Sequence, residues 1–94
     1  MKRLEIPIIA RYFYISAKQV EQGPFVGHAK KARKVYIWWL RTKYQLPYDL
    51  ISRVTSAPLS SCHTAFNYIE NAVQRGDKMY QNICNQLKDN ETLE

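Results

Sequence analysis

The most constraining feature of this sequence is the spacing of its apolar residues, which recur every three to four positions along most of the chain. Between residues 29 and 44 one such stripe consists of Ala32, Val35, Tyr36, Trp39 and Leu40. This spacing places apolar side chains on one face of an α-helix. Because no segment shows the apolar–polar alternation of a half-buried strand, the sequence predicts an all-α fold.

Proline and glycine divide this pattern into a compact domain of five or six helices. Pro7 suits the first turn of a helix that carries apolar residues through Ile15. Loops are predicted at 22–27, 45–47 and 56–59, where proline or glycine interrupts the apolar pattern. Pro47 can also begin the helix that follows the second loop. Gly76 is expected to end a helix. The expected helices after the first span 29–44, 48–55, about 60–75 with Ser60 or Ser61 as N-cap, and a last helix through Leu87 capped by Asp77.

The bulk composition indicates one folded domain in the cytosol. Ninety-four residues suffice for one core, and 46% of them are hydrophobic, which argues against disorder. The apolar runs are too short for a membrane span or a signal peptide. Cys62 and Cys84 fall among apolar positions, so buried free thiols are expected rather than a disulfide. Residues 89–94 are predicted to form a disordered acidic tail.

The titratable residues do not form a catalytic or metal-binding pattern. His28 and His63 have no carboxylate close in sequence. Neighbouring Cys62 and His63 diverge by about 100° on a helix, so they cannot act as nucleophile and base together. The spacing of the two histidines and two cysteines does not match zinc sites. We therefore expect neither an enzyme nor a cofactor, and no small-molecule substrate.

Positive charge is concentrated in one predicted helix. Residues 1–53 carry eleven Lys and Arg against three acids, whereas residues 54–94 carry three against five. The densest part, without any acid, consists of Lys30, Lys31, Arg33, Lys34, Arg41 and Lys43. Such a patch attracts a polyanion, most often a phosphate backbone. The alternative is an ordinary solvated helix face.

Residues 47–75 are typical of a helix-turn-helix, in which the start of the second helix enters the major groove. The polar face of the expected recognition helix at 60–75 consists of Ser60, Ser61, His63, Thr64, Asn67 and Asn71. Asn67 suits adenine, and the Thr64 methyl group suits thymine. Tyr68 and Arg75 are better placed for backbone phosphate. An ordinary amphipathic helix with a polar outer face is the alternative.

Three blocks of residues resemble the C-terminal DNA-binding domain of the bacterial replication initiator DnaA. Residues 9–20 are similar to that domain's first helix, 32–40 to its second, and His63-Thr64 to the Asp-His-Thr-Thr at the head of its recognition helix. The resemblance covers residues 8–87. It implies a Trp-repressor-like helical domain that binds a short duplex box without metal or nucleotide, and a basic loop that reaches the minor groove.

The sequence departs from this family where the family reads DNA. Residues 23–27 contain no basic residue, Cys62 stands in place of the family's Asp, and Ala65 in place of its last Thr. The turn before the recognition helix, 56–61, is also longer. Each good base contact contributes about 1–3 kcal/mol of discrimination. Because several of the family's contacts are missing here, we expect this protein to prefer a different target sequence. The resemblance covers the DNA-binding domain of the initiator and not its ATPase part. We therefore expect a stand-alone protein of a phage or mobile element that regulates replication or transcription.

The same departures leave a second function open. A protein-interaction or structural module that kept the fold and lost DNA recognition would use Phe25 and Val26 in the loop, together with Trp38. Trp38 lies beside the apolar stripe, so it is either a boundary aromatic that covers the core or an exposed platform. The exposure of these three side chains distinguishes the two functions.

Overall fold

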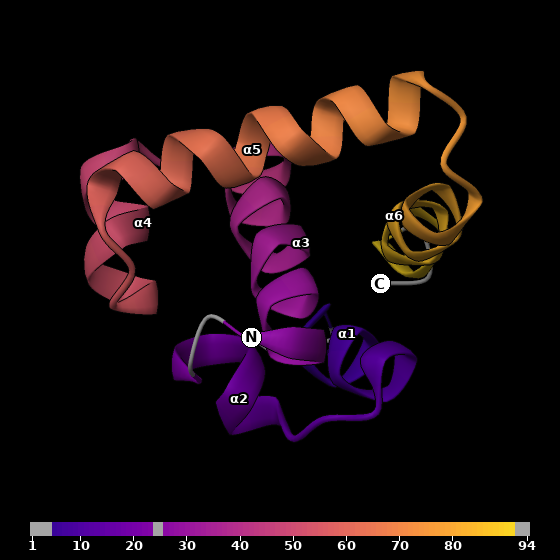
Figure 1. Cartoon of the computed structure of the whole chain (residues 1–94), viewed down its shortest axis with the longest axis horizontal. Helices are drawn as coiled ribbons and strands as arrows, with labels where there is room; N and C mark the ends of the chain where they lie inside the picture. Colours follow the sequence, from indigo (N-terminus) through magenta and orange to yellow (C-terminus); the bar gives the residue numbers. More distant parts are fainter. Residues whose placement is uncertain (1–4, 24–25, 92–94) are drawn as a thin grey trace.

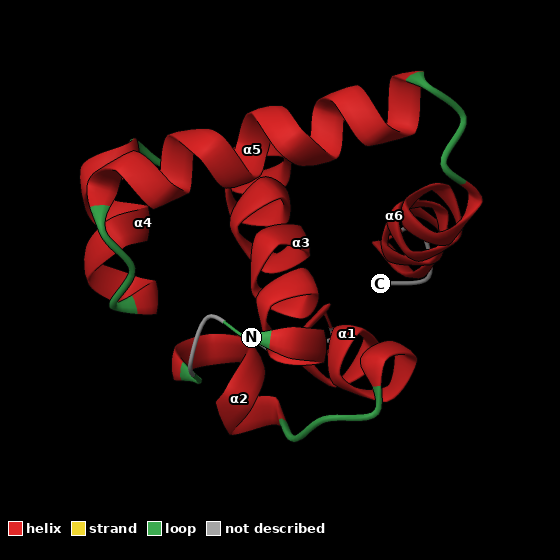
Figure 2. Cartoon of the chain, in the orientation of Figure 1, coloured by secondary structure: helices red, strands yellow, loops and turns green. Residues whose placement is uncertain are grey.

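The fold is all-α, as the apolar spacing predicts. The computed structural model describes residues 5–23 and 26–91, and these residues contain six helices and no strand (Figure 2). The helices are α1 (Glu5–Phe13), α2 (Ala17–Gln22), α3 (Gly27–Tyr44), α4 (Tyr48–Thr55), α5 (Leu59–Gln74) and α6 (Lys78–Glu91). Within these ranges, no helix has both the length and the apolar character needed to cross a bilayer.

Helix α3 is the central element of the domain. Figure 1 shows α5 lying across one end of α3 and α1 with α2 at the other end, with α4 and α6 on either side. The predicted stripe faces inward, and Val35, Tyr36 and Leu40 are completely buried. Both cysteines are buried and free, as expected. This arrangement leaves one long side of α5 turned away from the rest of the molecule.

The N-terminal segment forms two helices, so the prediction of one first helix over 9–20 is wrong. Tyr14 adopts a left-handed conformation with a φ of 59° and ends α1. The Ile15 N–H then donates to the Ala10 carbonyl at 3.0 Å, which satisfies an end carbonyl of α1. Ser16 starts α2 through a capping box, in which its Oγ accepts from the Gln19 N–H and its own N–H donates to Gln19 Oε1.

The start of α5 also differs from the prediction. The helix begins at Leu59 with Pro58 at the N-cap, so neither Ser60 nor Ser61 caps it. The connection from α4 is therefore only residues 56–58, and the longer turn predicted at 56–61 is wrong. Ser56, with a φ of 57°, turns the chain in the left-handed conformation that ends α4. A short turn of this kind is what a helix-turn-helix requires.

The end of α5 confirms the role expected of Gly76. Gly76 has a φ of 85° and follows the C-cap residue Arg75. The N–H of Gly76 donates to the Val73 carbonyl, and that of Asp77 donates to the Ala72 carbonyl. These two bonds form a Schellman motif, for which glycine is the preferred residue.

Helix α6 begins as expected and ends later than expected. Oδ1 of Asp77 accepts hydrogen bonds from the N–H groups of Met79 and Tyr80, which confirms it as the cap. The helix continues to Glu91, so the prediction of a disordered tail is wrong for residues 89–91. Residues 92–94 lie outside the described part of the chain.

Candidate nucleic-acid interface

Helices α4 and α5 form the two helices of the predicted helix-turn-helix. Their connection is held by the Ser52 hydroxyl, which donates to the carbonyl of the buried residue Ala57 at 2.5 Å. The inner side of α5 consists of Cys62, Ala65, Ile69 and Ala72, all buried, and α5 packs on both α3 and α4. The position of α5 is therefore fixed on its inner side by both α3 and α4.

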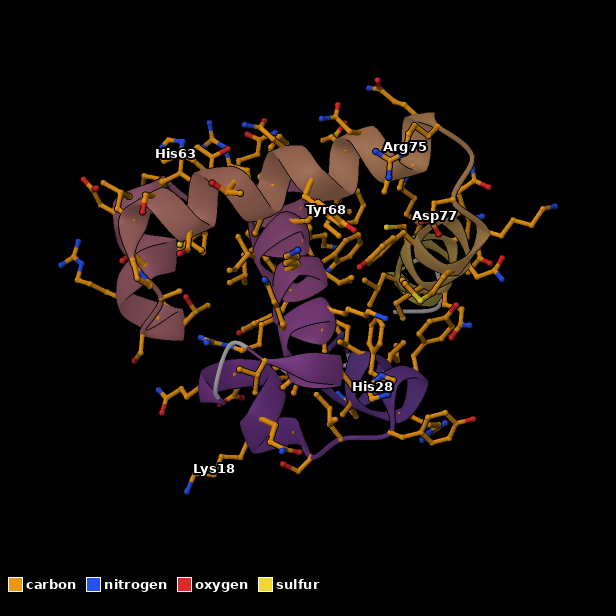
Figure 3. The ribbon with its side chains drawn as sticks, in the orientation of Figure 1. Lys18, His28, His63, Tyr68, Arg75 and Asp77 are labelled. Carbon is orange, nitrogen blue, oxygen red and sulfur yellow. The ribbon has the colours of Figure 1, made fainter. Side chains whose placement is uncertain are left out.

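The opposite side of α5 is polar and exposed along its length. Figure 3 shows polar side chains standing along this side, with His63 near its N-terminal end. The exposed polar residues near the head and middle of the helix are Ser60, His63, Thr64, Asn67 and Asn71, all predicted for base contact. The Thr64 hydroxyl donates to the Ser60 carbonyl at 2.9 Å, which leaves its oxygen and its methyl group for a ligand.

A groove between α3 and α5 brings together two sets of residues that are distant in sequence. Lys30 and Lys34 of α3 line it together with Ser60, Ser61 and Thr64 of α5, and its volume is about 450 Å³. The sequence predicted these residues separately, as a basic helix and as a recognition helix. Their presence in one groove makes the positive charge continuous with the polar face of α5.

Lys34 is held in place by an aromatic side chain of α5. Its Nζ lies 3.8 Å from the ring centroid of Tyr68, a cation–π distance. Tyr68 in turn meets the buried ring of Tyr80 edge to face, with centroids 5.8 Å apart. Partial burial lowers the pKa of Lys34, and the neighbouring charge of Lys30 lowers it further. The mutual repulsion of two lysines is relieved when an anion binds between them.

The N-terminal end of α5 adds to the positive potential of this groove. Pro58 at the N-cap makes no side-chain hydrogen bond to the first turn. The N–H groups of the first turn have no acceptor within the helix, and the helix dipole is positive at this end. A phosphate beside Ser60 and Ser61 would therefore meet both the lysines and the helix terminus.

His63 lies on the flank of α5 that is away from the groove, against a side chain of α4. Its ring and that of Tyr48 have centroids 3.8 Å apart and an interplanar angle of 33°. This contact fixes the orientation of an otherwise exposed imidazole. Tyr48 was not among the predicted site residues, because only the fold brings α4 beside the head of α5.

Arg33, predicted to bind DNA, is buried, and that prediction is wrong. Only 4% of the residue is exposed. Its guanidinium donates to the carbonyls of Gly23 at 2.8 Å and Glu21 at 3.3 Å, and to that of Thr55. These carbonyls lie at the C-terminal ends of α2 and α4, where a cation also complements the helix dipoles. Arg33 thus joins two helix ends to α3.

Trp38 is also buried, so its predicted use as an exposed platform is wrong and its reading as a boundary aromatic is correct. It is 3% exposed, and its Nε1–H donates to Glu70 Oε1 at 2.8 Å. Val26 is 64% exposed, whereas Phe25 lies outside the described residues.

The remaining predicted residues are exposed but lie away from the groove. Lys31 is exposed on α3 and does not line the groove between α3 and α5. Arg75 is exposed at the far end of α5, close to Asp77 in Figure 3. The candidate interface is therefore centred on the N-terminal half of α5.

The described residues offer no metal site, and the chain matches no known protein. Residues 5–23 and 26–91 contain no group of three or more His, Cys, Asp or Glu side chains that could hold a metal ion. No protein-family model matches the chain, and neither a curated protein nor a solved structure matches it.

Proposed function

We propose that this protein binds double-stranded DNA, with α5 as the recognition helix in the major groove. The observation that carries the proposal is the groove in which Lys30 and Lys34 meet Ser60, Ser61 and Thr64. Specific DNA binding needs two elements: cations that hold the phosphate backbone, and a polar helix face that reads the base edges.

The polar face of α5 has the chemistry that base reading needs. Thr64, Asn67 and Asn71 are exposed on the side away from the core. An Asn side chain can bond both N6 and N7 of adenine, and a threonine methyl group can contact that of thymine. These short side chains allow the helix to approach the bases closely. The lysines of α3 then supply affinity, and α5 supplies sequence preference.

We propose further that the chain is a divergent relative of the DnaA DNA-binding domain and acts in replication or transcription. The support is the similarity of residues 9–20 and 32–40, together with His63 and Thr64, which lie on the outer side of α5. The burial of Arg33 assigns that residue to the scaffold. The lysines of the groove take the place of the family's basic loop.

The competing function, a protein-interaction module, has less support. It depended on Trp38 as an exposed anchor, but that side chain is buried and bonded to Glu70. Val26 is exposed, but one valine side chain is far smaller than the surface that a stable partner buries.

A selection of bound sequences from random duplexes, followed by gel shifts at low salt, tests the proposal. We expect an enriched sequence and retardation that weakens steeply as salt rises. The double variant Lys30→Ala, Lys34→Ala should bind every duplex more weakly. Lys18→Ala is the matched control, because Lys18 is exposed on α2 at the opposite end of the molecule from His63 (Figure 3). Failure to retard any duplex at low salt would refute DNA binding.

A further inference from the structure

We infer that α5 carries a second phosphate-binding site on its other flank, made by Arg41, Tyr48 and His63, so that the protein contacts the backbones of both DNA strands. The inference rests on the proposed function. Each flank of α5 then contacts one strand of the duplex. The groove with Lys30 and Lys34 contacts the backbone of one strand, and the second cluster contacts the backbone of the other.

The helical positions of the contacting residues place the two clusters on opposite flanks of α5. Tyr68 holds Lys34, whereas His63 contacts Tyr48. At 100° per residue, these two positions on α5 are about 140° apart across its exposed face. Asn67 and Asn71 project between them. The face proposed to read bases is therefore bordered by a basic cluster on either side.

Helix α3 supplies cations to both flanks because it passes beneath α5. Lys30 and Lys34 lie in its first half and line the first groove. Arg41 lies in its last turn and lines a separate hollow with Phe66 and Glu70 of α5. The two hollows share no residue, so one basic helix serves two sites.

In the second cluster, the ring of Tyr48 contacts both Arg41 and His63. The guanidinium carbon of Arg41 lies 4.7 Å from the ring centroid of Tyr48, and the imidazole of His63 lies 3.8 Å from the same ring. Nη1 of Arg41 donates to the Leu46 carbonyl at 2.9 Å, which fixes the side chain. A guanidinium has five N–H donors, so this bond leaves others for a phosphate. His63 is exposed and offers a further ring N–H.

The position of Glu70 limits where a phosphate can bind on this flank. Glu70 lies about two turns beyond His63 on α5, and its carboxylate accepts a hydrogen bond from Trp38 Nε1. A phosphate next to this carboxylate would be repelled. The proposed contact is therefore made where Arg41 meets Tyr48 and His63, on the side of Arg41 away from Glu70 and level with the head of α5.

The dimensions of DNA fit this arrangement. An α-helix with its side chains is about 10–12 Å across. The major groove of B-DNA is about 12 Å wide. A helix seated in it has one phosphate backbone on each flank. A binding surface with cations on one flank only would leave the second backbone uncontacted.

Ethylation interference on the wild-type protein, with a selected duplex labelled on either strand, tests this inference without any variant. We expect ethylated phosphates to block binding on both strands. Lys30→Ala, Lys34→Ala should remove interference on one strand, and Arg41→Gln should remove it on the other. Arg41→Lys, which keeps the charge, should restore part of it.

The variants should also change the salt dependence of binding. Each lost phosphate contact lowers the slope of log K against log salt by about 0.9, so the double lysine variant loses about 1.8 and Arg41→Gln about 0.9. Interference confined to one strand, or an Arg41→Gln slope equal to that of wild type, would overturn the second site and leave DNA binding intact. No binding to any duplex would instead overturn the proposed function.

Discussion

Replacing Arg33 by methionine tests whether this residue belongs to the scaffold or to the DNA-binding surface. Methionine keeps an unbranched apolar stem and removes the guanidinium. The carbonyls of Gly23, Glu21 and Thr55 then lose their donor. The bond to Thr55 is buried and the other two are partly buried, so water can replace the donor only at the latter pair.

The expected loss of stability in Arg33→Met follows from these surroundings. An unsatisfied buried carbonyl costs about 1–3 kcal/mol, and each partly buried bond contributes about 0.5–1.5 kcal/mol. Because a buried charge carries a desolvation cost, burial lowers the pKa of Arg33, and a smaller effect from Cys62 opposes this. Removing that charge offsets part of the loss. We expect a net decrease in the free energy of unfolding of about 2–4 kcal/mol, a large share of the roughly 5–15 kcal/mol typical of a domain.

Urea unfolding followed by tryptophan fluorescence measures this effect, since Trp38 and Trp39 are both buried. With a slope of about 1 kcal/mol per molar urea, the midpoint should fall by about 2–4 M. Lys31→Met is the matched control, because Lys31 is exposed on the same helix and its change should stay within about 0.5 kcal/mol. A wild-type midpoint for Arg33→Met, combined with weaker DNA binding, would refute the scaffold role.

Three further predictions concern recognition, the core and alkaline pH. Thr64→Ala should relax preference at one base pair by about 1–3 kcal/mol, and an equal loss of affinity for all duplexes would contradict a reading role. Trp38→Phe removes the bond to Glu70 and should lower the free energy of unfolding by about 1.5–3 kcal/mol in a thermal melt, whereas lower DNA affinity at unchanged stability would contradict its core role. Burial is the main cause that raises the pKa of Cys84 from 9.0 to about 12, so the unfolded chain loses this proton first and stability falls as pH rises from 9.0 towards 12. Cys84→Ala should flatten that decline in urea midpoints, and an unchanged decline would contradict it.

The fold is largely predictable, because a helix with one apolar face can be recognised from the spacing of apolar residues in a single sequence. The inward stripe of α3 and the glycine that ends α5 are local features with local causes. The break at Tyr14 was not predictable in this way. A tyrosine with a φ of 59° carries no sequence signal, although Ser16 and Gln19 have the spacing of a capping box.

The candidate site was only partly predictable, because charge in a sequence does not reveal where a side chain points. Arg33 and Lys34 are neighbours, yet the first joins α2 and α4 inside the domain and the second lines the groove. The carbonyls that receive Arg33 lie 10 to 22 residues away in sequence. The contact of Tyr48 with His63 likewise depends on how α4 packs on α5.

The most direct test of DNA binding is the affinity for the selected duplex measured by fluorescence anisotropy over a range of salt concentrations. With Lys30, Lys34 and Arg41 each neutralising one phosphate, log K should fall against log salt with a slope of about −2.7 or steeper. The slope should be shallower for the double lysine variant and unchanged for Lys18→Ala. An affinity that does not depend on salt, or no binding at the lowest salt, would contradict the account.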